Sequence, residues 1–207
     1  MAAAGAGIFV TFEGGEGAGK STQLGLLGAR LRTQGKGVVE TREPGGPIRS
    51  LLVQGDRAWM PMTEALLHFA ARAEHLAETV LPALEDGSWV LCDRFADSTM
   101  AYQGYAQGLG RGPVEKLYEL VVGRLRPHLT LILDIPVELG LDRAIRRDVR
   151  ETRYERMGQD FHEKLRDAFR DIARREPERC VVINADQPVE DVHEAVWAAV
   201  RRRLTVA

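Results

Sequence analysis

A glycine-rich segment near the N-terminus carries the strongest chemical signal in the chain. Gly14-Gly15-Glu16-Gly17-Ala18-Gly19-Lys20-Ser21-Thr22 matches the pattern G-x-x-x-x-G-K-S/T, after an apolar run at 8–13 and before a helical pattern. The glycines let backbone N–H groups converge on phosphate oxygens at a helix N-terminus. Lys20 would reach the β- and γ-phosphates, and the Ser21 hydroxyl would ligate Mg²⁺. The segment predicts a nucleoside triphosphate site; the alternative is a glycine-rich turn at a helix start.

A second set of charged residues follows two other apolar runs. Asp93 ends the run at 89–93 and Arg94 comes directly after it, while Arg42 follows the run at 37–41. An acid that ends a strand beside the phosphate loop would hold Mg²⁺ or its water, and Arg94 would face a phosphate. A helix N-cap for Asp93 and a surface ion pair for Arg94 are the alternatives. We therefore expect a second anion site next to the phosphate loop.

The helical pattern around residues 62–81 carries a candidate pair for recognising a base. His68 and Arg72 lie four residues apart and therefore share one face of the helix. Such a pair suits a flat heterocycle, because the ring can stack on it and the guanidinium can donate to an exocyclic oxygen. The alternative places both side chains in solvent. The residues predicted to face a core are Ala65, Leu66, Phe69, Ala73, Leu76 and Val80.

Residues 142–156 form an arginine-rich segment. Its arginines recur at steps that allow one basic helical edge; they are Arg143, Arg146, Arg147, Arg150, Arg153 and Arg156. Such a run is usually a solvated charged face. In a phosphotransferase it would instead be a lid that closes over the triphosphate, stabilises charge on the transferring group and excludes water.

The elements that must position these residues alternate along the chain. Apolar runs at 8–13, 37–41, 89–93, 129–134 and 180–184 predict strands that are covered on both faces. Helical patterns lie near 20–34, 62–86, 113–125, 137–149, 159–175 and 188–203. Strand and helix in alternation predict an α/β fold with a parallel sheet, right-handed crossovers and helices on both faces. Ligands of such folds bind at the carboxyl ends of the strands.

Composition excludes several classes of protein. The 207 residues have a formal net charge of −2, which argues against a protein that coats nucleic acid or binds an anionic membrane surface. No apolar run approaches the roughly 18 residues of a membrane span, and the N-terminus lacks the basic stretch of a signal peptide. Two cysteines in a chain of this length are no disulfide framework, so we expect a cytoplasmic protein. The 28 basic residues comprise only four lysines, at positions 20, 36, 116 and 164.

Missing motifs narrow the kind of nucleotide-binding protein. A GTPase switch should also carry D-x-x-G and N-K-x-D, and the nearest approach to the second, Asn184-Ala185-Asp186-Gln187, lacks the lysine. The signature L-S-G-G-Q of transport ATPases is absent as well. The short chain therefore favours a kinase that acts on a small molecule. Another nucleoside or nucleotide kinase and a nucleotide-dependent switch remain the rival interpretations.

The chain resembles thymidylate kinases, the dTMP kinases of the nucleoside monophosphate kinase group. The resemblance spans about residues 8 to 201 and rests on seven segments in family order. These segments are Phe12 to Thr22, Thr41-Arg42-Glu43-Pro44-Gly45-Gly46, Phe69-Ala70-Ala71-Arg72, Asp93 to Gly104, Arg153-Tyr154-Glu155, Phe161-His162-Glu163-Lys164 and Asn184-Ala185-Asp186-Gln187-Pro188. Of the seven segments, only the phosphate loop is a specific signal when taken singly. All seven in family order are a highly specific signal of the family.

The resemblance implies a three-layer P-loop kinase fold with a five-stranded parallel sheet. It implies one domain over residues 1–207, with a lid at about 142–157. The implied reaction converts dTMP to dTDP with ATP and Mg²⁺, within dTTP biosynthesis. The implied partners are these two small molecules and a second copy of the chain in a homodimer, with no nucleic acid and no membrane.

The resemblance also implies roles for individual residues. The catalytic set is Lys20, Arg94, Arg147, Arg150 and Arg153, since Gly17-Ala18 stands where one family subtype carries an arginine and the lid would supply it instead. Mg²⁺ would be held by Ser21 and Asp93. ATP would contact Gly14, Gly15, Glu16, Gly17, Ala18, Gly19, Lys20, Ser21 and Thr22, with Ala185 and Gln187 at the adenine.

The implied dTMP site draws on residues from several segments. Glu16 would hold the 3′-hydroxyl, and Tyr102 would crowd the sugar 2′ position. Arg42, Pro44, Arg49 and Arg94 match the phosphate end, and Arg72, Ser98, Thr99 and Gln103 match the thymine edge.

Two departures from the family pattern affect this site. His68 stands where the family usually has its stacking phenylalanine, with Phe69 next to it, so either ring could contact the base. Pro47 alone separates Gly46 from Ile48, which makes the loop before Arg49 about five residues shorter than the family pattern.

Overall fold

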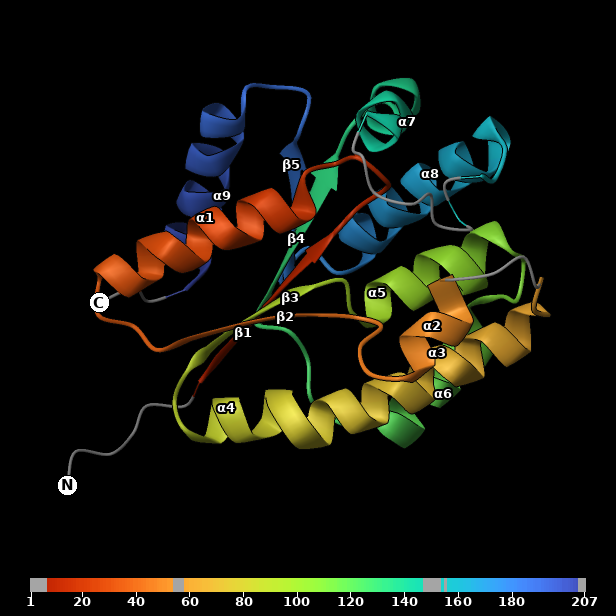
Figure 1. Ribbon diagram of the computed structural model, residues 1–207, viewed down its shortest axis with the longest axis horizontal. Coiled ribbons are helices and arrows are strands. Elements are labelled where there is room, and N and C mark those ends of the chain that lie inside the picture. Colours follow the sequence, from red (N-terminus) through yellow and green to blue (C-terminus); the bar gives the residue numbers. More distant parts are fainter. Residues whose placement is uncertain (1–6, 54–57, 147–153, 155, 205–207) are drawn as a thin grey trace.

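The computed structural model describes residues 7–53, 58–146, 154 and 156–204. A parallel sheet with the strand order β2-β3-β1-β4-β5 lies at its centre (Figure 1). The strands are β1 (Ile8–Glu13), β2 (Val38–Arg42), β3 (Trp89–Asp93), β4 (Leu129–Asp134) and β5 (Cys180–Asn184). The predicted strands are confirmed, although β2 lies one residue later than 37–41. Its position is set by pairing, because Arg42 stands opposite Asp93 at the end of β3.

The helices cover both faces of the sheet. They are α1 (Lys20–Thr33), α2 (Ile48–Val53), α3 (Pro61–His75), the π-helical η1 (Leu76–Val80), α4 (Leu81–Glu85), α5 (Ala96–Thr99), the π-helical η2 (Met100–Ala106), α6 (Arg111–Val121), α7 (Val137–Ile145), α8 (Gln159–Arg175) and α9 (Val189–Arg203). The helices predicted at 20–34, 159–175 and 188–203 are found within one residue at each end. The prediction at 62–86 corresponds to α3, η1 and α4 in succession. The end of the prediction at 137–149 lies outside the described residues.

The helical segment 96–106 was not predicted from the sequence. Residues such as Ser98, Thr99 and Gln103 supply no apolar stripe of helical period. These polar side chains line a cavity instead of meeting water, so the usual division into an apolar and a polar face is lost.

Three groups of buried side chains hold the layers together. On one face of the sheet, Leu27 of α1 and Val196 of α9 pack with Leu131 of β4. On the other face, a second group includes Phe9, Phe69 and Phe95, and a third group joins η2 to α8. Burial of this apolar surface stabilises the fold by roughly 25 cal/mol per Å² removed from water.

Two of the six residues predicted to face the core do not do so. Leu66 is 49% exposed and Ala73 is also exposed, whereas Phe69 and Leu76 are buried. The reason is that α3 presents apolar residues on two sides, of which only one packs on the sheet.

All five strands end in a polar residue. These residues are Glu13, Arg42, Asp93, Asp134 and Asn184. Because the strands are parallel, their carboxyl ends lie at one edge of the sheet. The fold therefore gathers charged groups at the edge where open α/β sheets bind ligands.

Candidate active site

The phosphate loop has the backbone geometry that its glycines allow. It leaves β1 at Glu13 and enters α1 at Lys20, and Gly14, Gly17 and Gly19 have φ values of 131°, 66° and 87°. A Cβ atom at Gly17 would lie 1.8 Å from the carbonyl oxygen of Gly140. A side chain is therefore excluded there by both conformation and space. The open N-terminus of α1 leaves backbone N–H groups for an anion.

The Lys20 side chain folds back over the loop. Its Nζ donates to the carbonyl oxygens of Gly15, at 2.7 Å, and Gly14, at 3.1 Å. Burial, assisted by the positive charge of Arg94, lowers the pKa of Lys20 to about 8. A triphosphate would supply the negative charge that this buried ammonium lacks.

Arg94 connects the phosphate loop to the neighbouring helical segment. Its Nη2 donates to Glu16 at 2.9 Å, and its Nη1 donates to the Gly14 carbonyl at 3.1 Å and to Ser98 at 3.2 Å. Its backbone has a φ of 68°, a conformation that non-glycine residues rarely adopt. The N–H of Arg94 donates to the carbonyl of Phe12 at 2.9 Å, which holds this turn against β1.

Glu16 is the negative centre of this arrangement. Burial by itself would raise its pKa, but the charges of Arg94 and Lys20 and a hydrogen bond from Tyr102 outweigh burial and lower the pKa to about 2. The Tyr102 hydroxyl donates at 2.7 Å, and its ring lies 5.1 Å from the Arg94 guanidinium carbon. Glu16 is therefore an ionised acceptor for a hydroxyl at neutral pH.

Two oxygen ligands suitable for a divalent cation meet at the end of β3. The Ser21 hydroxyl donates to Asp93 at 2.5 Å. Mg²⁺ is commonly bound by one or two protein oxygens together with phosphates and water, so this pair fits the ion. Among the described residues, no cluster of three or more His, Cys, Asp or Glu side chains is placed to hold a metal.

A cavity of about 650 Å³ opens beside the phosphate loop. Its wall brings together Glu16, Pro44, Arg49, His68, Arg72, Arg94, Ser98, Thr99, Tyr102 and Gln103, all of which the sequence predicts for substrate binding. Glu43, Phe95 and Tyr154 complete the wall.

Arg72 lies at the inner end of this cavity and is almost fully buried. Its Nε and Nη2 both lie 2.8 Å from Glu43, and its Nη2 also donates to Thr99 at 3.1 Å. Glu43 in turn lies 2.9 Å from His75, whose second ring nitrogen lies 2.8 Å from Thr41. A buried guanidinium needs such partners because a lone charge there would be strongly disfavoured.

Two predicted substrate residues lie away from the cavity wall. Phe69 is 1% exposed and packs in the core, where its ring lies 4.6 Å from the Arg72 guanidinium carbon. Arg42 is exposed at the end of β2. Of the two rings considered for contact with the base, the structure therefore places His68 in the cavity wall and Phe69 in the core.

The predicted adenine residues line a separate pocket on the other side of the phosphate loop. Ala185 and Gln187 lie there with Thr22, Gln23 and Arg143, and Arg143 donates to the Ala185 carbonyl at 3.1 Å. The three predicted lid arginines, Arg147, Arg150 and Arg153, lie outside the described residues.

Sequence reasoning missed several buried acids around the site. Glu13 accepts hydrogen bonds from the Phe95 N–H at 2.7 Å and from Ser98 at 2.6 Å. Burial and the nearby charge of Asp97 raise the pKa of Glu13 to about 7. Its only signal in the sequence is its place just before the phosphate loop. The sequence contains no comparable signal for Glu64, because a single acidic residue in an amphipathic helix is usually exposed to solvent.

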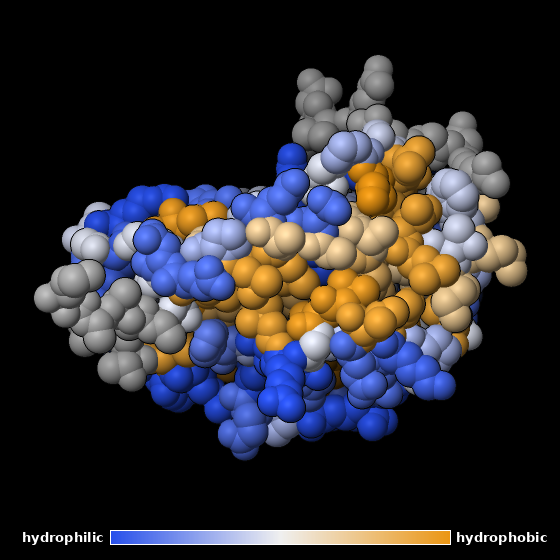
Figure 2. Space-filling model, turned by 90° about the horizontal axis from the view of Figure 1, so that it is seen from below, coloured by the Kyte–Doolittle hydropathy of each residue, from blue (hydrophilic) through white to orange (hydrophobic). Residues whose placement is uncertain are grey.

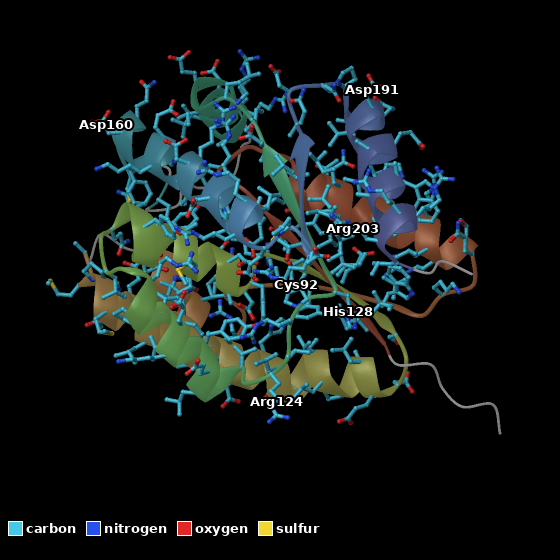
Figure 3. The ribbon with its side chains drawn as sticks, turned by 180° about the vertical axis from the view of Figure 1, so that it is seen from behind. Cys92, Arg124, His128, Asp160, Asp191 and Arg203 are labelled. Carbon is cyan, nitrogen blue, oxygen red and sulfur yellow. The ribbon has the colours of Figure 1, made fainter. Side chains whose placement is uncertain are left out.

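Other predictions concern thiols and membranes. Cys92 and Cys180 are free and buried, as expected, and Figure 3 shows Cys92 in the interior of the molecule. No helix in the described part of the chain combines the length and apolarity of a membrane span.

Comparison with known proteins gives one consistent result. The family model of thymidylate kinase matches residues 12–196. A thymidylate kinase of Caulobacter vibrioides is 51% identical over 205 residues, which cover 96% of this chain and 98% of that protein. One from Pelobacter propionicus is 46% identical, with 94% of each chain covered. The crystal structure of thymidylate kinase from Ehrlichia chaffeensis matches with a TM-score of 0.77 and 34% identity, over 94% of this chain and 98% of that one.

Proposed function

Since the chain belongs to the thymidylate kinase family, we propose that the cavity beside the phosphate loop holds dTMP while the loop holds ATP. The protein is an ATP-dependent nucleoside monophosphate kinase that converts dTMP to dTDP. One observation carries the assignment of the site. Arg94 and Glu16 belong both to the cavity wall and to the hydrogen-bond network of the phosphate loop. A phosphate bound in the cavity would therefore lie next to the γ-phosphate.

The proposed mechanism is in-line transfer to an oxygen of the acceptor phosphate. This oxygen is already anionic, so a strong general base is not needed. Lys20 binds the donor phosphates, and Arg94 neutralises charge between donor and acceptor. Glu16 accepts a hydrogen bond from the sugar 3′-hydroxyl, and the Tyr102 ring lies beside the sugar. Arg49, which lines the cavity, assists at the acceptor phosphate.

Mg²⁺ belongs to this proposal as the cofactor. Ser21 and Asp93 would hold it. When bound, the ion would supply positive charge that neutralises the donor phosphates during transfer. We assign the lid to residues 142–157 and the closing charges to Arg147, Arg150 and Arg153, in one kinase domain that spans the chain. The buried, reduced thiols are consistent with work in the cytoplasm.

A substrate panel tests the function. In a coupled assay for ADP with ATP and Mg²⁺, we expect dTMP to give the highest kcat/KM among dTMP, dUMP, UMP, CMP and AMP. Arg72 and Gln103 present a donor and an acceptor to a pyrimidine, and Tyr102 crowds a 2′-hydroxyl. Faster turnover of UMP or AMP would contradict the assignment.

We also propose a homodimer formed through the face of α3, η1 and α4 that points away from the sheet. The exposed residues of this face are apolar over its whole length: Met62, Leu66, Ala70, Ala73, Ala77 and Leu81. Leu120 of α6 adds a side chain that is 81% exposed. Figure 2 shows this face as a broad apolar area. Large apolar areas on a soluble protein mark interaction sites. A twofold axis would pack this face of one copy against the same face of a second copy.

Replacing Leu66 by Glu should dissociate this dimer. The new carboxylate would lie in the middle of the stripe, where pairing with the second copy buries it without a partner. Analytical ultracentrifugation should show wild type as a dimer at micromolar concentration and the variant as a monomer. Leu26→Glu, at an exposed position of α1, should remain dimeric. A monomeric wild type would contradict the proposal.

A further inference from the structure

Two polar atoms in the cavity wall are buried without a hydrogen-bond partner among the described residues. They are Nη1 of Arg72, which is a donor, and Oε1 of Gln103, which is an acceptor. Both residues line the cavity, and both side chains are almost fully buried. Unpaired buried polar atoms are rare, so a pair of this kind indicates a ligand edge with a matching acceptor and donor.

Arg72 and Gln103 present these atoms because their other polar atoms are occupied. Nε and Nη2 of Arg72 both contact the Glu43 carboxylate, and Nη2 also donates a hydrogen bond to Thr99. The amide nitrogen of Gln103 donates a hydrogen bond to Oε1 of Glu64 at 3.0 Å. A carboxylate can only accept hydrogen bonds, so Glu64 requires the nitrogen of Gln103 and leaves the amide oxygen unpaired.

Glu64 is itself held in place. It is 1% exposed, and its carboxylate also accepts hydrogen bonds from Gln107, at 3.2 Å, and from the Tyr154 hydroxyl. Three donors thus converge on one buried carboxylate: Gln103 from η2, Gln107 from the turn that follows η2, and Tyr154. This set of donors fixes Glu64 as an acceptor and prevents the Gln103 amide from rotating by 180°.

We propose that Glu64 is a positioning residue that sets the orientation of the Gln103 amide and so selects thymine over cytosine. The inference rests on the proposed function. Thymine presents the O4 acceptor next to the N3–H donor, which complement the Arg72 donor and the Gln103 oxygen. Cytosine presents an amino group next to an unprotonated N3, so both contacts would be mismatched. Each mismatch that leaves a buried polar group unpaired lowers binding by about 5- to 150-fold.

Glu64→Met provides the test, because methionine has similar length and no acceptor for the Gln103 amide. The ratio of kcat/KM for dTMP to that for dCMP should fall by about 10-fold or more, mainly through a higher KM for dTMP. The ratio of dTMP to dUMP should stay within about twofold, because uracil has the same O4 and N3–H edge. Glu64→Gln keeps one acceptor oxygen and should retain part of the preference.

Two further variants separate orientation from a general structural role. Glu74→Met makes the same change at an exposed position of α3 and should leave both ratios unaltered. Gln103→Met should lower the preference for dTMP over dCMP by at least as much as Glu64→Met does, and Arg72 should maintain the remainder. Adding Glu64→Met to Gln103→Met should lower the preference no further, because Glu64 acts through Gln103. Additive losses in the double variant would overturn the inference. A dTMP to dCMP ratio equal to that of wild type in folded Glu64→Met would also overturn it. If Glu64→Met does not fold, an unchanged ratio in Gln103→Met would do so. A wild-type enzyme without activity on dTMP would overturn the proposed function instead.

Discussion

Replacement of Lys20 by Ala should lower kcat/KM for dTMP by about 10³-fold or more while the protein stays folded. The Lys20 ammonium lies directly over the phosphate loop. Loss of one preorganised donor to a charged transition state lowers kcat on the order of 10²–10³-fold. The measurement is steady-state kinetics with saturating ATP and Mg²⁺. Near-normal activity would contradict the assignment of the phosphate loop.

The same variant should not lose stability. Burial lowers the pKa of Lys20 from 10.5 to about 8, so the charged form is less stable in the folded than in the unfolded state. Below pH 8 this difference of about 2.5 pKa units opposes folding by up to about 3 kcal/mol. Removing the amine should therefore leave the free energy of unfolding at pH 7 unchanged or higher in urea titrations. Lys36→Ala, at the opposite end of the sheet, is the matched control and should keep full activity.

Replacement of Arg94 by Met should be nearly as damaging to activity and should also destabilise the protein. We expect a loss of about 10³-fold in kcat/KM, because Arg94 is the cation shared by the donor loop and the acceptor cavity. The variant also leaves Glu16 without its ion-pair partner. The cost should be roughly 2–3 kcal/mol, below the value for fully buried pairs because 18% of Arg94 and 15% of Glu16 remain exposed.

The loss of stability in this variant should grow with pH. In wild type the pKa of Glu16 lies below its unfolded value of 4.5, so its stabilising contribution is complete above pH 4.5 and is lost as the pH falls towards 2. Without Arg94, Lys20 and the Tyr102 hydrogen bond still lower the pKa of Glu16, but burial is the largest single influence, so we expect the folded pKa to rise above 4.5. Stability is then lost as the pH rises through the folded pKa.

The difference in free energy of unfolding between wild type and Arg94→Met should therefore be larger at pH 8 than at pH 5. Arg175→Met, which breaks an exposed pair with Asp171, should leave the free energy of unfolding nearly unchanged at either pH, because solvent screens such a pair. Equal losses for Arg94→Met at the two pH values would contradict the proposed role of the ion pair.

Local patterns in the chain predicted most of the fold. All five strands were predicted from short apolar runs. The expected cover on both faces is confirmed for the inner strands β1, β3 and β4, whereas the edge strands β2 and β5 are only partly buried. The helical segment 96–106 could not be predicted in this way, since its side chains meet a cavity instead of water. Leu66 and Ala73 were misplaced for a related reason: periodicity shows that a face is apolar, but it does not show which surface covers that face.

Some residues of the candidate site could likewise be predicted from the sequence, and others depend on packing. The phosphate loop, Asp93 and Arg94 follow strands directly, so their order in the sequence predicts where they meet. His68 and Phe69 are adjacent in the sequence, and only packing decides that Phe69 enters the core while His68 faces the cavity.

The sequence by itself determined the chemistry of the phosphate loop, the parallel sheet and the edge at which ligands bind. These features depend on residues that are contiguous or that repeat with a fixed period. The tertiary structure alone decided which acids are buried and what they hold. Glu64 meets Gln103 from 39 positions away and Tyr154 from 90 positions away, and Glu43 meets His75 from 32 positions away. The charge state and hydrogen bonds of a carboxylate depend on such distant partners and on the water that they exclude, so neither can be read from its neighbours in the chain.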